Sequence, residues 1–205
     1  MKWDNFLSSC QSGDIILFDG SWWLSRLIEW GQNSHYSHVG MILRSPTYIR
    51  EDLSGIYLLQ SGYDKTPDIL TGKCHLGVQI TPIEGIRDEM IKDGGSLWVR
   101  CLHCSKGLLF EERVKSALSI VKDDSYDLDP VDWIKGRFDI EIGDTQRTNT
   151  FFCSALIAYM YVQMDLLESS LPWSIISPRH FSAKENEQLS FINCSLEEDE
   201  QIILT

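Results

Sequence analysis

The sequence predicts an α+β domain whose short, mainly antiparallel strands pack against helices. Short apolar runs recur between turns rich in glycine, proline, serine and aspartate, which is typical of strands. Two longer segments, 108–121 and 153–164, have the apolar character of helices. The chain has neither regular βαβ alternation nor a glycine-rich phosphate loop, so a doubly wound parallel sheet is not expected.

The amino-terminal half is expected to supply most of the strands. They are 15–18, 38–43, 55–61, 76–81 and 97–102, each bounded by turn residues. Helices are expected at 1–9, 22–30 and 82–92, the last of which begins at a proline. Along the strand that opens at His38, alternation puts Gly40 and Ile42 on the histidine's face and Val39 and Met41 on the other.

The carboxy-terminal half is expected to be mainly helical. The helix 108–121 is amphipathic, with five residues facing inward: Leu109, Val114, Ala117, Leu118 and Val121. Further expected elements are an acidic loop, a short helix, a polar approach to Cys153, an apolar helix, a capped helical turn and two late strands. Their ranges are 123–129, 130–135, 139–149, 153–164, 177–181, 189–193 and 201–204.

The composition of the chain argues against several classes of protein. The 205 residues are expected to form a single domain, residues 1–205, and 43% of them are hydrophobic, which suffices for a core. The net charge of −12 argues against nucleic acid and against charge-driven docking to anionic lipid, and leaves an apolar membrane contact open. Six cysteines are too few for a disulfide scaffold. With no signal peptide or apolar run near ~20 residues, we expect a cytoplasmic protein with free thiols.

Cys153 is expected at the first turn of its apolar helix. Thr148, Asn149 and Thr150 precede it, and their side chains are suited to cap the helix. The partial positive charge at a helix N-terminus favours thiolate and lowers a cysteine pKa. His38 opens an apolar strand far upstream. A cysteine and a histidine placed in this way form the working pair of a thiol enzyme if the fold brings them together.

Five short motifs occur in a definite order along the chain. They are Gly-Asp-Ile at 13–15, Ser-His-Val-Gly at 37–40, Leu-Gln-Ser at 59–61, Phe-Cys-Ser at 152–154 and Ser-Pro-Arg-His-Phe at 177–181. This ordered set resembles the circularly permuted branch of the NlpC/P60 papain-like superfamily, in particular the YiiX/YaeF-type permuted amidase group with bacterial and poxviral members. The resemblance covers nearly the whole chain. It implies a permuted papain-like fold, with a small, mainly antiparallel sheet or barrel packed against helices.

The resemblance also implies catalytic roles for three residues. Carried over by position, Cys153 is the nucleophile and His38 is the base, and the permutation explains why the histidine comes first. Gln60 stands where many relatives carry a glutamate as the third polar group. A glutamine can orient an imidazole but adds no charge, as in Cys-His-Asn enzymes. Glu51 and Asp52 are the alternative orienting residues, although neither lies on the expected strand.

The expected reaction is that of a cofactor-free cysteine hydrolase, a peptidase or amidase. His38 takes the Cys153 proton, the thiolate attacks a carbonyl to form an acyl-enzyme, and His38 then protonates the leaving group. The amide of Cys153 is the expected oxyanion donor, because first-turn amides lack internal partners.

The expected substrate is a peptide, isopeptide or lipid. A lipid-directed thiol acyltransferase or esterase, and a catalytically silent binding module that retains the groove, remain alternatives. If the chain is viral, its location is the virion or host cytoplasm.

Other cysteines and histidines receive structural interpretations. Cys101, His103 and Cys104, together with Cys74 and His75, offer zinc ligands, but their spacing is not that of a known finger. A redox Cys-x-x-Cys normally starts a helix, and here the helix begins late. We therefore expect chance cysteines at a strand end, and no metal.

Three further polar residues and the tryptophans are expected to have structural roles. His180 is expected to belong to a structural Ser-Pro turn and His35 to a loop. Asp14 is expected to bond local turn amides. Tryptophans of the segment 22–30 are expected in the core and the groove wall.

Overall fold

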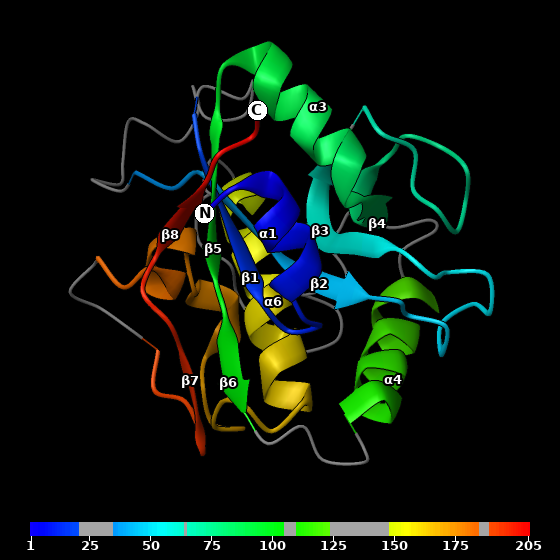
Figure 1. Cartoon of the computed structure of the whole chain (residues 1–205). Helices are drawn as coiled ribbons and strands as arrows, with labels where there is room; N and C mark the ends of the chain where they lie inside the picture. The colour runs from blue at the N-terminus through cyan, green and yellow to red at the C-terminus, as the bar shows by residue number, and fades with distance from the viewer. Residues whose placement is uncertain (21–34, 64, 105–109, 124–147, 185–188) are drawn as a thin grey trace.

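A six-stranded sheet organises the computed structural model, which describes residues 1–20, 35–63, 65–104, 110–123, 148–184 and 189–205. Its strand order is β4-β3-β2-β1-β5-β8, and every neighbouring pair is antiparallel (Figure 1). The strands are β1 Ile15–Asp19, β2 His38–Arg44, β3 Ile56–Tyr63, β4 Leu76–Pro82, β5 Ser96–Arg100 and β8 Glu200–Ile202. Within the described residues β4 and β8 are open edges, so the expected α+β class is confirmed and the closed-barrel alternative is wrong.

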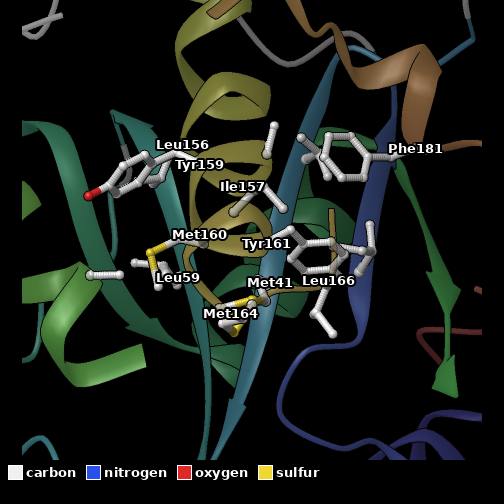
Figure 2. Packing of buried hydrophobic residues seen from close by; sticks show 14 of the residues in the cluster. Met41, Leu59, Leu156, Ile157, Tyr159, Met160, Tyr161, Met164, Leu166 and Phe181 are labelled. Carbon is white, nitrogen blue, oxygen red and sulfur yellow. The ribbon is translucent and has the colours of Figure 1, made fainter. Parts of the chain in front are cut away.

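One face of the sheet is covered by α6 (Thr148–Gln163) and α4 (Phe110–Asp123). Apolar residues of both helices pack against side chains that alternate along the strands, among them Val39, Met41 and Leu59. Figure 2 shows Ile157, Met160 and neighbouring side chains of α6 against Met41 and Leu59. The alternation expected along β2 is thereby confirmed, and Cys153 belongs to this cluster.

The other face is covered by α1 (Trp3–Ser9) and α3 (Ile83–Asp93). Its cluster contains the strand residues Ile16, Phe18, Ile42 and Leu58. Gly40 lies between them, and a Cβ at this position would come within 2.8 Å of Leu58 side-chain atoms. A larger residue therefore cannot replace this glycine unless Leu58 moves.

A two-stranded ribbon stands beside the main sheet. It pairs β6 (Leu102–Cys104) with β7 (Cys194–Leu196) in antiparallel register. The strand expected at 97–102 is therefore divided into β5 and β6 around Cys101, which lies outside both. The strand expected at 189–193 is wrong, because only an isolated bridge between Leu167 and Phe191 occurs there.

The remaining expectations fall into two groups. The helical turn expected at 177–181 is confirmed as η3 (Pro178–Phe181), which follows η2 (Trp173–Ile175). The segments 22–30 and 130–135, most of 123–129 and most of 139–149 lie outside the described residues. In the described ranges, every helix is too short or too polar to cross a bilayer.

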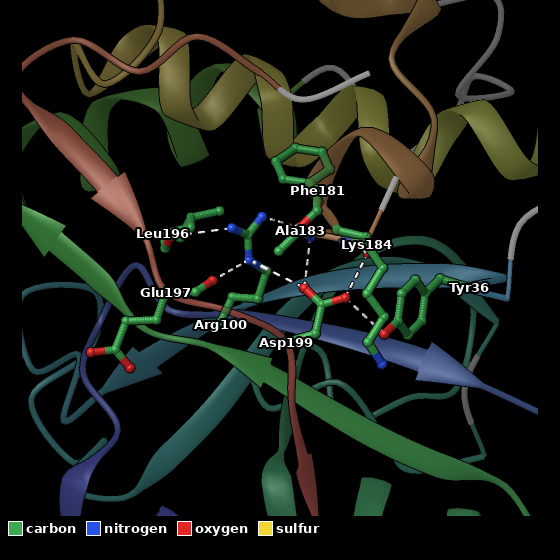
Figure 3. A network of polar contacts seen from close by, with 9 residues as sticks. Tyr36, Arg100, Phe181, Ala183, Lys184, Leu196, Glu197 and Asp199 are labelled. Atoms are coloured by element: carbon green, nitrogen blue, oxygen red, sulfur yellow. Dashed lines mark hydrogen bonds and ion pairs between the residues drawn. The ribbon is translucent and has the colours of Figure 1, made fainter. Parts of the chain in front are cut away.

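A buried ion pair fastens the carboxy-terminal segment to the sheet (Figure 3). Arg100 on β5 and Asp199 lie 3.3 Å apart, and both side chains are almost fully covered. The same carboxylate accepts hydrogen bonds from the Tyr36 hydroxyl at 2.8 Å and from the Ser182 hydroxyl at 2.6 Å. The guanidinium also donates to the Phe181 carbonyl at 2.8 Å. Because both charges are compensated by several partners, the network holds distant segments together without an unpaired buried charge.

Candidate active site

His38 and Gln60 form a buried hydrogen bond between β2 and β3. The His38 Nε2 and Gln60 Oε1 atoms lie 2.7 Å apart, and the residues are 6% and 1% exposed. An amide oxygen only accepts hydrogen bonds, so the hydrogen is on His38 Nε2 and the lone pair of the neutral ring is on Nδ1. The Gln60 Nε2 atom lies 3.3 Å from the Thr81 hydroxyl on β4, which favours this orientation of the amide.

The imidazole of His38 is held in its neutral form. Burial lowers the pKa of His38 to about 4, and the hydrogen bond with Gln60 opposes that shift only in part. The Phe18 ring packs edge-on against it with centroids 4.9 Å apart. At pH 7 the residue is therefore an unprotonated base with a fixed tautomer.

Cys153 lies in the second turn of its helix rather than the first, because α6 begins at Thr148. The residue is 1% exposed, and burial raises the pKa of its thiol to about 11. Amides of Val39, Cys153 and Ser154 bond to the sulfur and oppose the rise. The lowered pKa expected from a helix start is thus wrong for this state of the protein, since desolvation outweighs the amide dipoles.

The Cys153 thiol and the His38 imidazole both lie near the gap that opens where the ladder between β2 and β3 ends. The ladder between these strands runs from Met41–Leu59 to Arg44–Ile56, so His38 and Val39 extend beyond it. The Ile42 amide bonds to the Asp14 carbonyl on the β1 side, so the alternate amides of β2, including that of Val39, point toward β3. Cys153 bonds to the Val39 amide from the face covered by α6.

His38 reaches the same gap from the opposite face. By alternation its side chain shares the face of Ile42, and it contacts Phe18 and Gln60 there. The described structure therefore brings His38 and Gln60 into direct contact. It brings Cys153 to the peptide group that links His38 to Val39.

Two contributors were missed by reasoning from sequence. Thr81 supports the Gln60 amide, and Phe18 contacts the His38 ring. Both residues lie on strands that the sequence predicts, but the pairing register that makes them neighbours depends on the whole sheet. Phe18 pairs with His38 and Thr81 pairs with Leu58, and the sequence pattern does not reveal these cross-strand pairings.

The alternative orienting residues lie elsewhere. Glu51 and Asp52 are both exposed, and Asp52 is paired with Arg50 at 2.6 Å. His180 accepts a hydrogen bond from the Ser177 amide at 3.0 Å, which confirms its place in a structural turn. Asp14 bonds to the local Gln11 amide, as expected, and also to the amide of Leu102.

The cysteines considered as metal ligands are spread over several elements. Cys74 is exposed and donates to the Lys65 carbonyl, whereas Cys101 follows β5 and Cys104 ends β6. Among the residues that the structure describes, no three His, Cys, Asp or Glu side chains gather in a way that would hold a metal ion.

No protein-family model matches the chain, and no curated protein is detectably similar to it.

Proposed function

We propose that the chain is a cysteine-dependent hydrolase of the peptidase or amidase class, with Cys153 as nucleophile and His38 as general base. The observation that carries the proposal is the buried bond between His38 and Gln60. It assigns the basic lone pair to His38 Nδ1 at the end of β2, where Cys153 bonds to the next amide along the chain. This ordered set of histidine, amide and cysteine supports the resemblance to permuted papain-like enzymes.

The proposed reaction begins from a neutral pair. With the pKa of Cys153 raised to about 11 and that of His38 lowered to about 4, a preformed thiolate–imidazolium pair is disfavoured. The proton therefore passes from Cys153 to His38 as the sulfur attacks the substrate carbonyl, in the manner of a serine hydrolase. The His38 imidazolium then protonates the leaving group, and water releases the acyl group from Cys153.

The Val39 amide supports a further part of the mechanism. It points out of the strand ladder toward the sulfur, and an amide so placed can stabilise negative charge. Val39 and Ser154 therefore join Cys153, the expected donor, as candidates for stabilising the thiolate or oxyanion.

Acyl trapping tests the proposal. The protein is incubated with activated acyl esters and with peptide p-nitroanilides, product release is followed, and the acylated residue is located by mass spectrometry. We expect an acyl adduct on Cys153 that is lost in Cys153→Ala and strongly reduced in His38→Ala. Cys10→Ala is the matched control, since Cys10 is also buried and its pKa is also raised to about 11, but it lies on the other face.

Either of two results would overturn the proposal. One is acylation of Cys10 as readily as Cys153, and the other is an acylation rate that does not change in His38→Ala. Hydrolysis seen only when the acyl ester is presented in lipid vesicles would instead assign the protein to lipid chemistry.

A binding module without catalysis is the second candidate. It is favoured by the nearly complete burial of Cys153 and His38 and by their approach from opposite faces of the sheet. For this candidate, unchanged protein would be recovered from every substrate, and Cys153→Ala would keep the binding properties of the wild type.

A further inference from the structure

The two strands of the small ribbon place two cysteines directly opposite each other. Cys104 ends β6, Cys194 begins β7, and the register pairs their Cα atoms. Nothing in the candidate active site uses either residue. Both residues are reduced thiols, both are partly buried, and both pack against the core on the α6 side of the sheet.

The alternation of hydrogen bonds along the ribbon determines whether Cys104 and Cys194 form a hydrogen-bonded or a non-hydrogen-bonded pair. The Glu197 amide donates to the Cys101 carbonyl at 2.9 Å, so those two residues form a hydrogen-bonded pair. Antiparallel ladders alternate between hydrogen-bonded and non-hydrogen-bonded pairs, which makes Cys104 and Cys194 a non-hydrogen-bonded pair. The Leu102 amide agrees with this parity, because it bonds to the Asp14 carboxylate instead of to β7.

A non-hydrogen-bonded antiparallel pair suits a disulfide. Its Cα atoms lie about 4.5 Å apart with the side chains close together, and disulfides span Cα separations of about 4.4–6.8 Å. The two cysteines share the face of Leu102 and Leu196, which are cross-strand neighbours. The type of pair thus matches the Cα separation that a disulfide requires.

We propose that Cys104 and Cys194 form a reversible disulfide, which makes the β6–β7 ribbon a site of thiol oxidation by a disulfide such as oxidised glutathione. One cysteine thiolate attacks a glutathione sulfur, which breaks the glutathione S–S bond, forms a mixed disulfide and expels one glutathione thiolate. The second cysteine thiolate attacks the protein sulfur of the mixed disulfide and expels the other. Two electrons pass from the cysteines to one oxidised glutathione, and the two thiol protons end on two reduced glutathiones.

The surroundings accommodate the oxidised form. The Cys194 thiol lies 3.7 Å from the Leu166 carbonyl, a weak contact that oxidation removes. That carbonyl keeps the Ile192 amide as a donor at 2.9 Å. The Leu166 carbonyl thus keeps a partner in the oxidised form. The bond would close the chain from 104 to 194, the portion that contains α4 and α6.

Peptide mapping of the full chain tests the proposal. The protein is equilibrated in buffers of oxidised and reduced glutathione, the remaining thiols are alkylated in denaturant, and the digest is analysed without reduction. We expect one intramolecular link, between Cys104 and Cys194, with the other four of the six cysteines alkylated. The oxidised protein should melt roughly 5–10 °C higher, because a bond that closes a long loop restricts mainly the unfolded chain.

Matched variants sharpen the result. Cys104→Ser and Cys194→Ser should each abolish the link, whereas Cys101→Ser should leave it intact, since that residue stands opposite Glu197. Stable glutathione adducts on both cysteines without a link, a bond to any other cysteine, or bonds only between molecules would overturn the proposal. The mapping of the wild-type chain decides this even if a variant fails to fold.

Discussion

Gln60 on β3 accepts a hydrogen bond from His38 on β2, and the two atoms lie 2.7 Å apart at a point closed to solvent. A carboxylate there would stabilise a charged imidazolium, but the glutamine fixes a neutral ring, and the pKa of His38 is lowered to about 4. Burial therefore keeps the His38 ring neutral, and the glutamine brings no negative charge that would reverse this effect.

Replacement of Gln60 by glutamate should raise the pKa of His38. A nearby carboxylate favours the protonated ring, so we expect an increase of roughly 1–3 units. Titration of the His38 ring protons by NMR measures the change. Gln60→Leu is the control of similar size without charge, and it should lower the pKa of His38 further. A value that stays near 4 in Gln60→Glu would show that the two side chains do not interact in solution.

The burial of His38 should make the protein less stable in mild acid. Its pKa of about 4 in the folded state lies below the ordinary value of 6.5, so the unfolded chain binds the proton more tightly. The stability is therefore fully present above pH 6.5 and falls as the pH drops toward 4, by up to about 3 kcal/mol. Denaturant unfolding between pH 4 and 7 measures this slope. His38→Gln should reduce the slope.

Cys153 should react slowly with iodoacetamide at neutral pH. With a pKa of about 11, only about one molecule in ten thousand carries the thiolate at pH 7. The exposed Cys74 should therefore be alkylated first, as mass spectrometry of partially labelled protein can measure. Faster labelling of Cys153 than of Cys74 would mean that the protein in solution forms a thiolate that this buried geometry disfavours.

Gly40→Ala should destabilise the protein by about 1–3 kcal/mol, because the new methyl group meets Leu58 at 2.8 Å. Gly62→Ala on the neighbouring strand is the matched control. There the nearest atom is His38 Cε1 at 3.5 Å, an ordinary contact, so we expect a much smaller change. Chemical denaturation compares the two. The double variant Gly40→Ala/Leu58→Ala should lose less stability than the sum of the losses in the two single variants.

Asp199→Asn should cost about 3 kcal/mol or more, since it leaves the Arg100 guanidinium buried without its counter-charge. Asp52→Asn is the matched control, because Asp52 and Arg50 form an exposed pair that contributes little. Thermal unfolding of both variants checks the contrast. Equal effects would argue that the buried network of Figure 3 is replaced by solvent contacts in solution.

Local patterns sufficed for much of the fold. Apolar runs bounded by turns identified all six strands of the main sheet. Amphipathic spacing identified α4 with four of its inward residues, Val114, Ala117, Leu118 and Val121, whereas Leu109 lies outside the described residues. The division of 97–102 into β5 and β6 escaped this reasoning because it depends on different partners. Val99 pairs with Glu200 in the main sheet, whereas Leu102 pairs with Leu196 in the ribbon. Side-chain periodicity carries no information about such partners.

Reasoning from sequence named candidate site residues but did not predict their electrostatics. Motif order pointed to His38, Gln60 and Cys153, and the structure joins the first two directly. The helix-start argument gave the wrong direction for the pKa of Cys153. It considered the amide dipoles and omitted desolvation, which depends on everything packed around the sulfur.

The strand order also means that the strands of the main sheet become available for pairing at different times during synthesis. β1, β2, β3 and β4 are consecutive neighbours in the sheet, so all strands of this meander are present once residue 82 has been made. The β8 strand pairs with β5 only at the end of the chain, and closure of so long a loop is slow. His38 and Gln60 are therefore synthesised while β5 and β8 are still missing. Cys153 follows later, so the proposed base and orienting residue are made well before the proposed nucleophile.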